Sequence, residues 1–299
     1  MQSAAPEEKL VATPAATMAQ RLSFPALIVG NLCLAFGPWM VRLTDVGPVA
    51  AGFWRLALAA PIMLLLIPVT GQRAGRITGG LWWLLAIAGI CFALDLAAWH
   101  VGIRLTRLAN ATLFGNSTSF LFVAYGFLVA RRWPGRNQSI ALALAVAGVG
   151  LLLGRSFRLS PDHVLGDLFC LLAAVLYLGY LIAIDRARAT LPPLPALGIS
   201  TIVGAVLLLP LAFAFGETVM PGNWTPLILL ALGSQLFGQG LIVYSIAYQP
   251  PTVVGLALLV QPVVAATIGW IAYGETLAAA DLFGAAAVAA ALVLVRRKD

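Results

Sequence analysis

Charged residues are scarce in this sequence. Only 10% of its 299 residues are charged, while 61% are hydrophobic, whereas an average soluble domain carries about 25% charged residues. The core of a soluble protein of this length cannot enclose so much apolar surface, so the composition predicts that lipid surrounds most of the chain. The sequence therefore indicates an all-α integral membrane protein, because a helix satisfies its own backbone hydrogen bonds in a bilayer.

Cysteine is also rare, and the motifs of several enzyme classes are missing. Cys33, Cys91 and Cys170 lie in apolar runs without a CxxC pair or a nearby histidine, which argues against a disulfide framework or a metal site. The sequence contains no GxxxxGK[ST] phosphate-binding loop, no HExxH and no GxSxG, so it supports neither nucleotide hydrolysis nor these hydrolase chemistries. We therefore expect no cofactor and no enzyme activity.

Ten apolar runs approach or exceed the roughly 20 residues that a spanning helix requires. They are residues 24–43, 48–69, 81–103, 109–130, 138–154, 165–185, 196–215, 225–247, 252–272 and 281–295. The connections are short and carry turn signals, so they leave no room for a soluble domain. Residues 1–22 are polar and lack the apolar core of a signal peptide, and we expect them to form a disordered cytoplasmic tail.

The distribution of basic residues predicts the orientation of these helices. With the N-terminus in the cytoplasm, twelve Lys and Arg residues fall on the cytoplasmic side and five on the other, while Arg55 lies within a helix. This excess and the even number of helices predict that both termini are cytoplasmic. Topology thus explains the net charge of +7, and we expect no nucleic-acid partner.

The two halves of the chain show weak internal similarity. GICFALDLAAWHVGI (89–103) aligns with SQLFGQGLIVYSIAY (234–248), and in the same register Asn116 aligns with Gln261. Because five helices per half is an odd number, the second half must be inserted upside down. We expect residues 23–157 (helices one to five) and 163–297 (helices six to ten) to form two inverted repeats, a recurring plan of secondary transporters whose substrate site lies between the repeats.

Two stretches carry a family signature. LAFGPWMVRLTDVGPVAAGFWRLALAA (34–60) has an aromatic-Gly motif followed by a Pro and an apolar-aromatic-Arg-Leu motif, and AYQPPTVVGLALLVQPVVAATIGWIAYGETL (247–277) contains Gln-Pro and Gly-Glu pairs. Over residues 24–297 the chain resembles the EamA type of the drug/metabolite transporter superfamily. It departs from the family pattern at Asn116-Ser117, where Pro is usual, and at Ala130-Arg131, where Gly-Glu is usual. The resemblance implies a ten-helix exporter in the cytoplasmic (inner) membrane, similar to bacterial exporters of aromatic and neutral amino acids.

Asp95 and Arg55 are charged residues inside apolar runs. At a rise of about 1.5 Å per residue, Asp95 lies about 12 Å and Arg55 about 10 Å from the outer ends of their helices. Opposite charges at similar depth on consecutive helices suggest an ion pair, because an unpaired charge is costly in a bilayer. The pair either locks the two helices together, or Asp95 faces a cavity and meets a substrate amine or a proton.

Polar residues at similar depth extend this candidate site. Trp99 lies on the same helix face as Asp95. His100, near the helix end, is either a core or interfacial residue or a substrate ligand. The corresponding stretch of the second half supplies residues that are either helix–helix contacts or site residues, namely Gln235, Gln239, Tyr244 and Ser245.

Amide and aromatic residues complete the prediction. Asn116 and Gln261 occupy equivalent positions in the two halves, where the family's cavity would lie, and are expected to line it. Tyr177 and Tyr180 are three residues apart and therefore share a helix face. Such a pocket suits an amphipathic metabolite with an apolar side chain.

The sequence thus predicts a gradient-driven secondary transporter that exports small amphipathic metabolites, foremost aromatic or neutral amino acids, by alternating access. Alternatives are an exporter of cationic drugs, an intramembrane enzyme that acts on a lipid, or a receptor that binds without transport. The expected partners are a small-molecule substrate and the lipid bilayer, with the chain a monomer or a weak homodimer. The predicted substrate-binding residues, with Arg55 as a charge partner, are Asp95, Trp99, His100, Asn116, Tyr177, Tyr180, Gln239, Tyr244 and Gln261.

Overall fold

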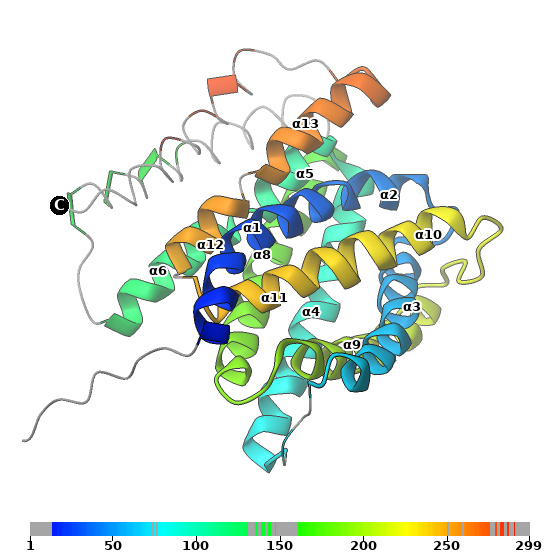
Figure 1. The fold of residues 1–299 in the computed structure, drawn as a ribbon. Helices are drawn as coiled ribbons and strands as arrows, with labels where there is room; N and C mark the ends of the chain where they lie inside the picture. The colour runs from blue at the N-terminus through cyan, green and yellow to red at the C-terminus, as the bar shows by residue number, and fades with distance from the viewer. Residues whose placement is uncertain are drawn as a thin grey trace, which may run out of the picture.

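A computed structural model describes residues 14–72, 77–130, 161–249, 251–258 and 260–275, with isolated residues at 75 and within 135–147 and 279–290. All regular structure in these ranges is helical (Figure 1). The helices are α1 (Pro14–Ala35), α2 (Gly37–Leu43), α3 (Pro48–Val69), α4 (Gly79–Leu105), α5 (Leu108–Gly115), α6 (Thr118–Ala130), α8 (Pro161–Arg188), α9 (Pro193–Ala214), α10 (Thr225–Leu229), the π-helix η1 (Leu230–Gln239), α11 (Gly240–Ile246), α12 (Pro251–Leu258) and α13 (Val260–Tyr273).

Six helical stretches in the described part are long and apolar enough to cross a membrane. They are Met18–Leu43, Pro48–Val69, Gly79–Leu105, His163–Arg188, Pro193–Ala214 and Thr225–Ile246. For the described part of the chain, the prediction of an all-helical protein with membrane-spanning helices is therefore confirmed. The predicted helices at 138–154 and 281–295 lie largely outside the described residues, so the total of ten spanning helices stays a prediction.

The first helix begins earlier than the sequence prediction placed it. α1 starts at Pro14, whereas residues 1–22 were expected to form a disordered tail. A proline in the first turn and the alanines that follow favour a helix here, because Pro is preorganised for that position and Ala has the highest helix propensity. Residues 1–13 lie outside the described part.

Two interruptions shape the helices of the first half. The chain breaks at Gly37-Pro38: α1 ends at Ala35 and α2 begins at Gly37, because proline lacks the N–H that a continuing helix needs. The second interruption was not predicted. Residues 109–130 form two helices instead of one, and Asn116 caps the end of α5 before α6 begins at Thr118.

The segment predicted as a single α-helix at 225–247 contains a π-helix. η1 lies between α10 and α11 and buries Ser234, Gln235, Gly238 and Gln239. Its i→i+5 hydrogen bonds widen the turn and change which side chains lie above one another. Such segments occur frequently at functional sites, and this one carries two buried glutamines, Gln235 and Gln239.

Helices from distant parts of the chain pack together. α4 runs through the middle of the bundle and packs along α8 and α9, and α3 packs on α9 (Figure 1). α1 lies against η1 and α11, and α13 lies against α5. The two halves of the chain are therefore packed against each other along several helices, and a space at the centre of the bundle is bounded by both.

Glycines permit the closest helix contacts. A Cβ atom on Gly89 of α4 would lie 2.6 Å from Cβ of Val203 and 2.7 Å from the carbonyl oxygen of Ser200, both in α9. A Cβ on Gly102 would lie 2.8 Å from the carbonyl oxygen of Gly166 in α8. Such small-residue contacts are typical of helix packing in membranes, where van der Waals contact stabilises association.

The outward surface of the bundle is apolar. Leu65 is 70% exposed, Val206 69% and Ile271 73%, and each belongs to a different helix. A soluble monomer rarely exposes so extensive an apolar surface. The surface fits a bundle whose outer side chains contact lipid.

Gly89→Ala should destabilise the bundle, because its methyl group meets the backbone of α9. Overpacking of this kind costs about 1–3 kcal/mol, so the apparent Tm of the detergent-purified protein should fall. Gly80→Ala is the matched control in the same helix, since nothing lies within 4 Å of a Cβ there. A Gly89→Ala protein as stable as the Gly80→Ala protein would contradict the close packing of α4 on α9.

Candidate functional site

A cavity with an empty volume of about 460 Å³ lies between the two halves of the chain. The described residues include no group of three or more His, Cys, Asp or Glu side chains that could hold a metal ion. The cavity is lined by Leu34, Arg55, Phe92, Asp95, Leu96, Trp99, Thr112, Gly115, Asn116, Tyr177, Gln239 and Gln261.

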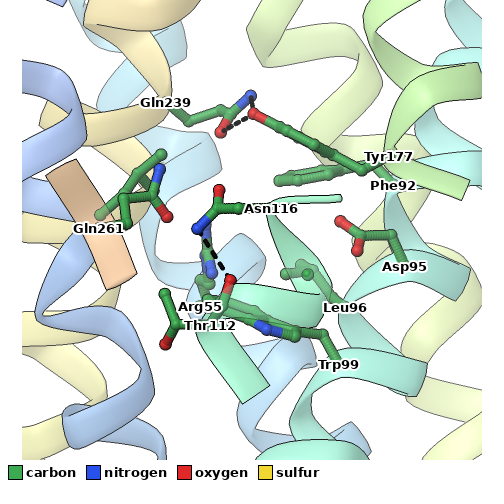
Figure 2. Close-up of a pocket in the computed structure, with 12 residues that line it drawn as sticks. Arg55, Phe92, Asp95, Leu96, Trp99, Thr112, Asn116, Tyr177, Gln239 and Gln261 are labelled. Atoms are coloured by element: carbon green, nitrogen blue, oxygen red, sulfur yellow. Dashed lines mark hydrogen bonds between the residues drawn. The ribbon is translucent and has the colours of Figure 1, made fainter. Parts of the chain in front are cut away.

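The two charged residues of the cavity do not form the predicted ion pair. Nε of Arg55 donates instead to Oε1 of Gln235, at 3.1 Å, and among the described residues the ion pair lies elsewhere, between Arg42 and Glu275. In Figure 2 the carboxylate of Asp95 points into the cavity from the side opposite Gln261. Similar depth along the two helices does not fix the direction in which each side chain points.

A neutral hydrogen-bond chain holds the Arg55 guanidinium. Gln235 accepts from Arg55 through Oε1 and donates through Nε2 to the hydroxyl of Thr201, at 3.1 Å. All three side chains are buried, and they come from α3, η1 and α9. Because Arg55 can only donate, it fixes which end of the Gln235 amide faces it, and the Thr201 hydroxyl accepts from the other end.

The two predicted amides both line the cavity. Nδ2 of Asn116 donates to the carbonyl oxygen of Thr112, at 2.9 Å, at the end of α5 (Figure 2). Nε2 of Gln261 donates to Oδ1 of Asn31, at 2.8 Å, and Asn31 in turn donates to the carbonyl oxygen of Leu27. Asn31 was missed in the sequence, where it is an isolated amide in an apolar run.

One wall of the cavity is aromatic. The hydroxyl of Tyr177 lies 3.3 Å from Oε1 and 3.2 Å from Nε2 of Gln239, so these two lining residues are hydrogen-bonded (Figure 2). Tyr180 does not line the cavity. It stacks behind the wall, with its ring centroid 4.6 Å from that of Phe92 and 5.5 Å from that of Tyr177.

Trp99 lines the cavity where α4 meets α5. Its indole Nε1 donates to the carbonyl oxygen of Ala111, at 3.3 Å. Gly115 allows this approach, because a Cβ there would lie 3.0 Å from the same nitrogen. The glycine was missed as a site residue, since its contribution is the absence of a side chain.

Two further predicted site residues lie away from the cavity lining. His100 is fully buried, and its Nδ1 lies 3.1 Å from the carbonyl oxygen of Pro48, so Nδ1 donates and joins α4 to the start of α3. The hydroxyl of Tyr244 donates to the carbonyl oxygen of Ala19, at 2.9 Å, and thereby joins α11 to α1. In both cases a backbone carbonyl on a neighbouring helix binds the polar group.

Phe92, Leu96, Leu34 and Thr112 also line the cavity but were not predicted. Phe92 is three residues before Asp95 and shares its helix face, so helical spacing could have found it. Leu96 directly follows Asp95 and could not have been found in this way. Leu34 and Thr112 carry no comparable signal, because an apolar residue or a threonine inside a spanning helix is ordinary.

A hydrogen-bonded cluster joins the ends of four helices one to two turns from the cavity. Nη1 of Arg42 pairs with Oε1 of Glu275 at 2.8 Å, and Nη2 donates to the carbonyl oxygen of Thr106 at 2.7 Å. Both oxygens of Glu275 accept from the backbone N–H of Leu108 at the start of α5. The carboxylate thus stabilises the N-terminus of a helix while it binds a cation from α2.

Comparisons with known proteins agree with this architecture. Residues 23–154 and residues 164–297 each match the sequence profile described as the EamA-like transporter family. The chain is 26% identical over 260 residues to the "Uncharacterized transporter YwfM" of Bacillus subtilis (strain 168), covering 83% of this chain and 84% of that protein. A protein of known crystal structure, 17% identical, superposes with a TM-score of 0.66 over 93% of this chain and 97% of its own, which supports the fold.

The Arg42–Glu275 contact should appear as coupling in a double-mutant cycle. Arg42→Gln and Glu275→Gln should each destabilise the protein by about 1–3 kcal/mol, because each leaves a mostly buried charge without its partner. The double variant should lose less than the sum of the two, because the second change removes the stranded charge. Apparent Tm values of the four purified proteins test this, and strictly additive losses would contradict the pairing.

Proposed function

The chain belongs to the EamA-like transporter family, and on this premise we propose that it is a secondary carrier that exports small amphipathic metabolites by alternating access. As a family member it is a multi-pass protein of the cell membrane, with a small-molecule substrate. The direction of transport and the substrate class are proposals. We expect amino acids with aromatic or neutral side chains.

The observation that carries this proposal is the composition of the cavity. It combines two charged residues with amides and an aromatic wall, and the residues come from both halves of the chain. Polar groups of this kind suit the charged end of an amino acid, and the rings of Phe92, Trp99 and Tyr177 suit its side chain. A site bounded by two halves can be reached from either membrane face when the halves move relative to each other.

The proposed architecture has ten spanning helices in two inverted repeats, with both termini in the cytoplasm. The repeats are residues 23–157 and 163–297, and the helices at 138–154 and 281–295 complete them. The two matches to one family profile support a duplicated unit. Because the sequence has no phosphate-binding loop, the proposed carrier is driven by gradients.

Export of cationic compounds is a second candidate. The carboxylate of Asp95 lies among aromatic rings in the cavity, and such surroundings suit an organic cation. Arg55 lines the same cavity and would repel a ligand that carries only positive charge. This favours the amino-acid assignment.

Counterflow in proteoliposomes tests the proposed function. Vesicles loaded with unlabelled phenylalanine should take up labelled phenylalanine in a saturable way, while empty liposomes should not. Gln239→Leu should lower the initial rate about three- to tenfold, because one hydrogen bond to the substrate is lost. Gln249→Leu is the matched control, since Gln249 lies outside the cavity and its Nε2 donates to the hydroxyl of Ser23 in α1.

The amino-acid assignment would be contradicted if the proteoliposomes took up no more phenylalanine than empty liposomes do. The protein used must elute as a single monodisperse species. Competition by bulky organic cations alone would favour the second candidate. Chemical conversion of a lipid or another probe, without movement across the bilayer, would instead indicate an enzyme.

A further inference from the structure

Arg55 lines the cavity, and part of its guanidinium makes no hydrogen bond within the described part of the chain. The residue is 1% exposed, and its Nε donates to Gln235. Its Nη1 is buried and has no hydrogen-bond partner among the described residues. Arginine offers five N–H donors in a planar fork, so this side chain retains donors for a ligand in the cavity.

Asp95 presents the opposite charge in the same cavity. It is 7% exposed, and within the described structure neither carboxylate oxygen has a hydrogen bond or an ion pair. The carboxylate points toward the centre of the cavity (Figure 2). Cation and anion thus face one space and attract each other across it, but they form no direct ion pair.

Gln235 explains how Arg55 keeps its charge available. An acidic residue at this position would pair with the guanidinium and cancel its charge. The glutamine instead offers one neutral acceptor, at 3.1 Å, and is itself fixed by Thr201. Arg55 is therefore held in place by a neutral partner, which does not cancel its positive charge.

The two charges in the cavity determine which charges a well-bound ligand must carry. Charges at this depth are costly unless they find a partner. A ligand with one charge would satisfy either Arg55 or Asp95 and leave the other unpaired. A zwitterion satisfies both, and Arg is suited to bind its carboxylate through two parallel hydrogen bonds.

The aromatic wall lies beside the cation. Cζ of Arg55 is 5.8 Å from the centroid of the Phe92 ring, and Phe92 stacks on Tyr180. The ring shields the guanidinium from solvent on that side and offers an apolar surface next to the charged end of the ligand. An α-amino acid has this arrangement of charged and apolar groups.

We propose that Arg55 binds the carboxylate and Asp95 the ammonium group of a zwitterionic substrate, so that these two residues select for an intact α-amino acid. Arg55 is then a specificity-determining residue and not a structural partner of Asp95. This inference rests on the proposed function, since it assigns two residues of the same site to the two ends of the transported molecule.

Three probes that differ in one group test the assignment. They are phenylalanine, phenylalaninamide, which lacks the carboxylate, and 3-phenylpropionate, which lacks the ammonium group. Competition against labelled phenylalanine counterflow gives an apparent affinity for each. The wild-type protein should prefer phenylalanine over either analogue by about tenfold or more, because each analogue leaves one buried charge unpaired.

Two conservative variants should each abolish one preference. Arg55→Gln should bring phenylalaninamide within about twofold of phenylalanine, because the carboxylate then has no cation to meet. Asp95→Asn should do the same for 3-phenylpropionate and keep the preference over the amide. Each variant thus serves as the control for the other.

Gln235→Glu separates binding from folding. It keeps Arg55 and the shape of the site but supplies a carboxylate that pairs with the guanidinium. We expect the preference for phenylalanine over its amide to fall about tenfold or to vanish, even if Arg55→Gln does not fold. A purely structural Arg55 would leave that preference unchanged in Gln235→Glu.

Equal affinity of the wild-type protein for phenylalanine and its amide would overturn the inference, as would a preference that survives both Arg55→Gln and Gln235→Glu. In those cases counterflow persists and the proposed carrier stands. No counterflow of phenylalanine by folded wild-type protein would overturn the proposed function, and this inference with it.

Discussion

A charge inside a membrane-embedded bundle must have a partner, and this constraint explains how the centre of the protein is built. Arg42 satisfies this constraint by forming an ion pair with Glu275. Arg55 and Asp95 do not satisfy this constraint by pairing with each other. Both line the same cavity, and Arg55 is hydrogen-bonded to the neutral amide of Gln235. Two incompletely paired charges are costly inside a membrane. If Arg55 and Asp95 had no function, they would be expected to form an ion pair. In the proposed carrier the substrate supplies the missing partners.

Irregular backbone surrounds this cavity and makes it accessible to polar groups. α5 ends at Gly115 and is capped by Asn116, two residues before α6 begins, and the π-helix η1, which contains Gln235 and Gln239, replaces part of an α-helix. Interrupted helices at membrane depth are tolerated where they line a cavity, because other groups satisfy the freed backbone atoms. Here Asn116 does so at the end of α5 through its side-chain bond to Thr112. Polar side chains can thus reach the cavity without unpaired backbone facing lipid.

Much of the fold follows from hydrophobicity alone, because a bilayer allows few alternatives to spanning helices. Helical spacing and the alignment of the two halves were enough to select Asp95, Trp99, Asn116 and Gln261, all of which line the cavity. They could not show that Arg55 contacts Gln235, since depth gives the height of a residue and not its direction around the helix. His100, Tyr180 and Tyr244 lie outside the lining for the same reason. The break at Asn116 and the π-turns of η1 also depend on tertiary packing, which the sequence pattern does not carry.

Access to the cavity from both membrane faces is the central claim, and it can be measured with one cysteine. Thr112→Cys, in a protein whose Cys33, Cys91 and Cys170 are replaced by alanine, places a thiol in the lining with little change in size. We expect membrane-impermeant thiol reagents to label it from either side in right-side-out and inside-out vesicles, and phenylalanine to slow both reactions. Labelling from one face only, unaffected by phenylalanine, would contradict alternating access to this cavity.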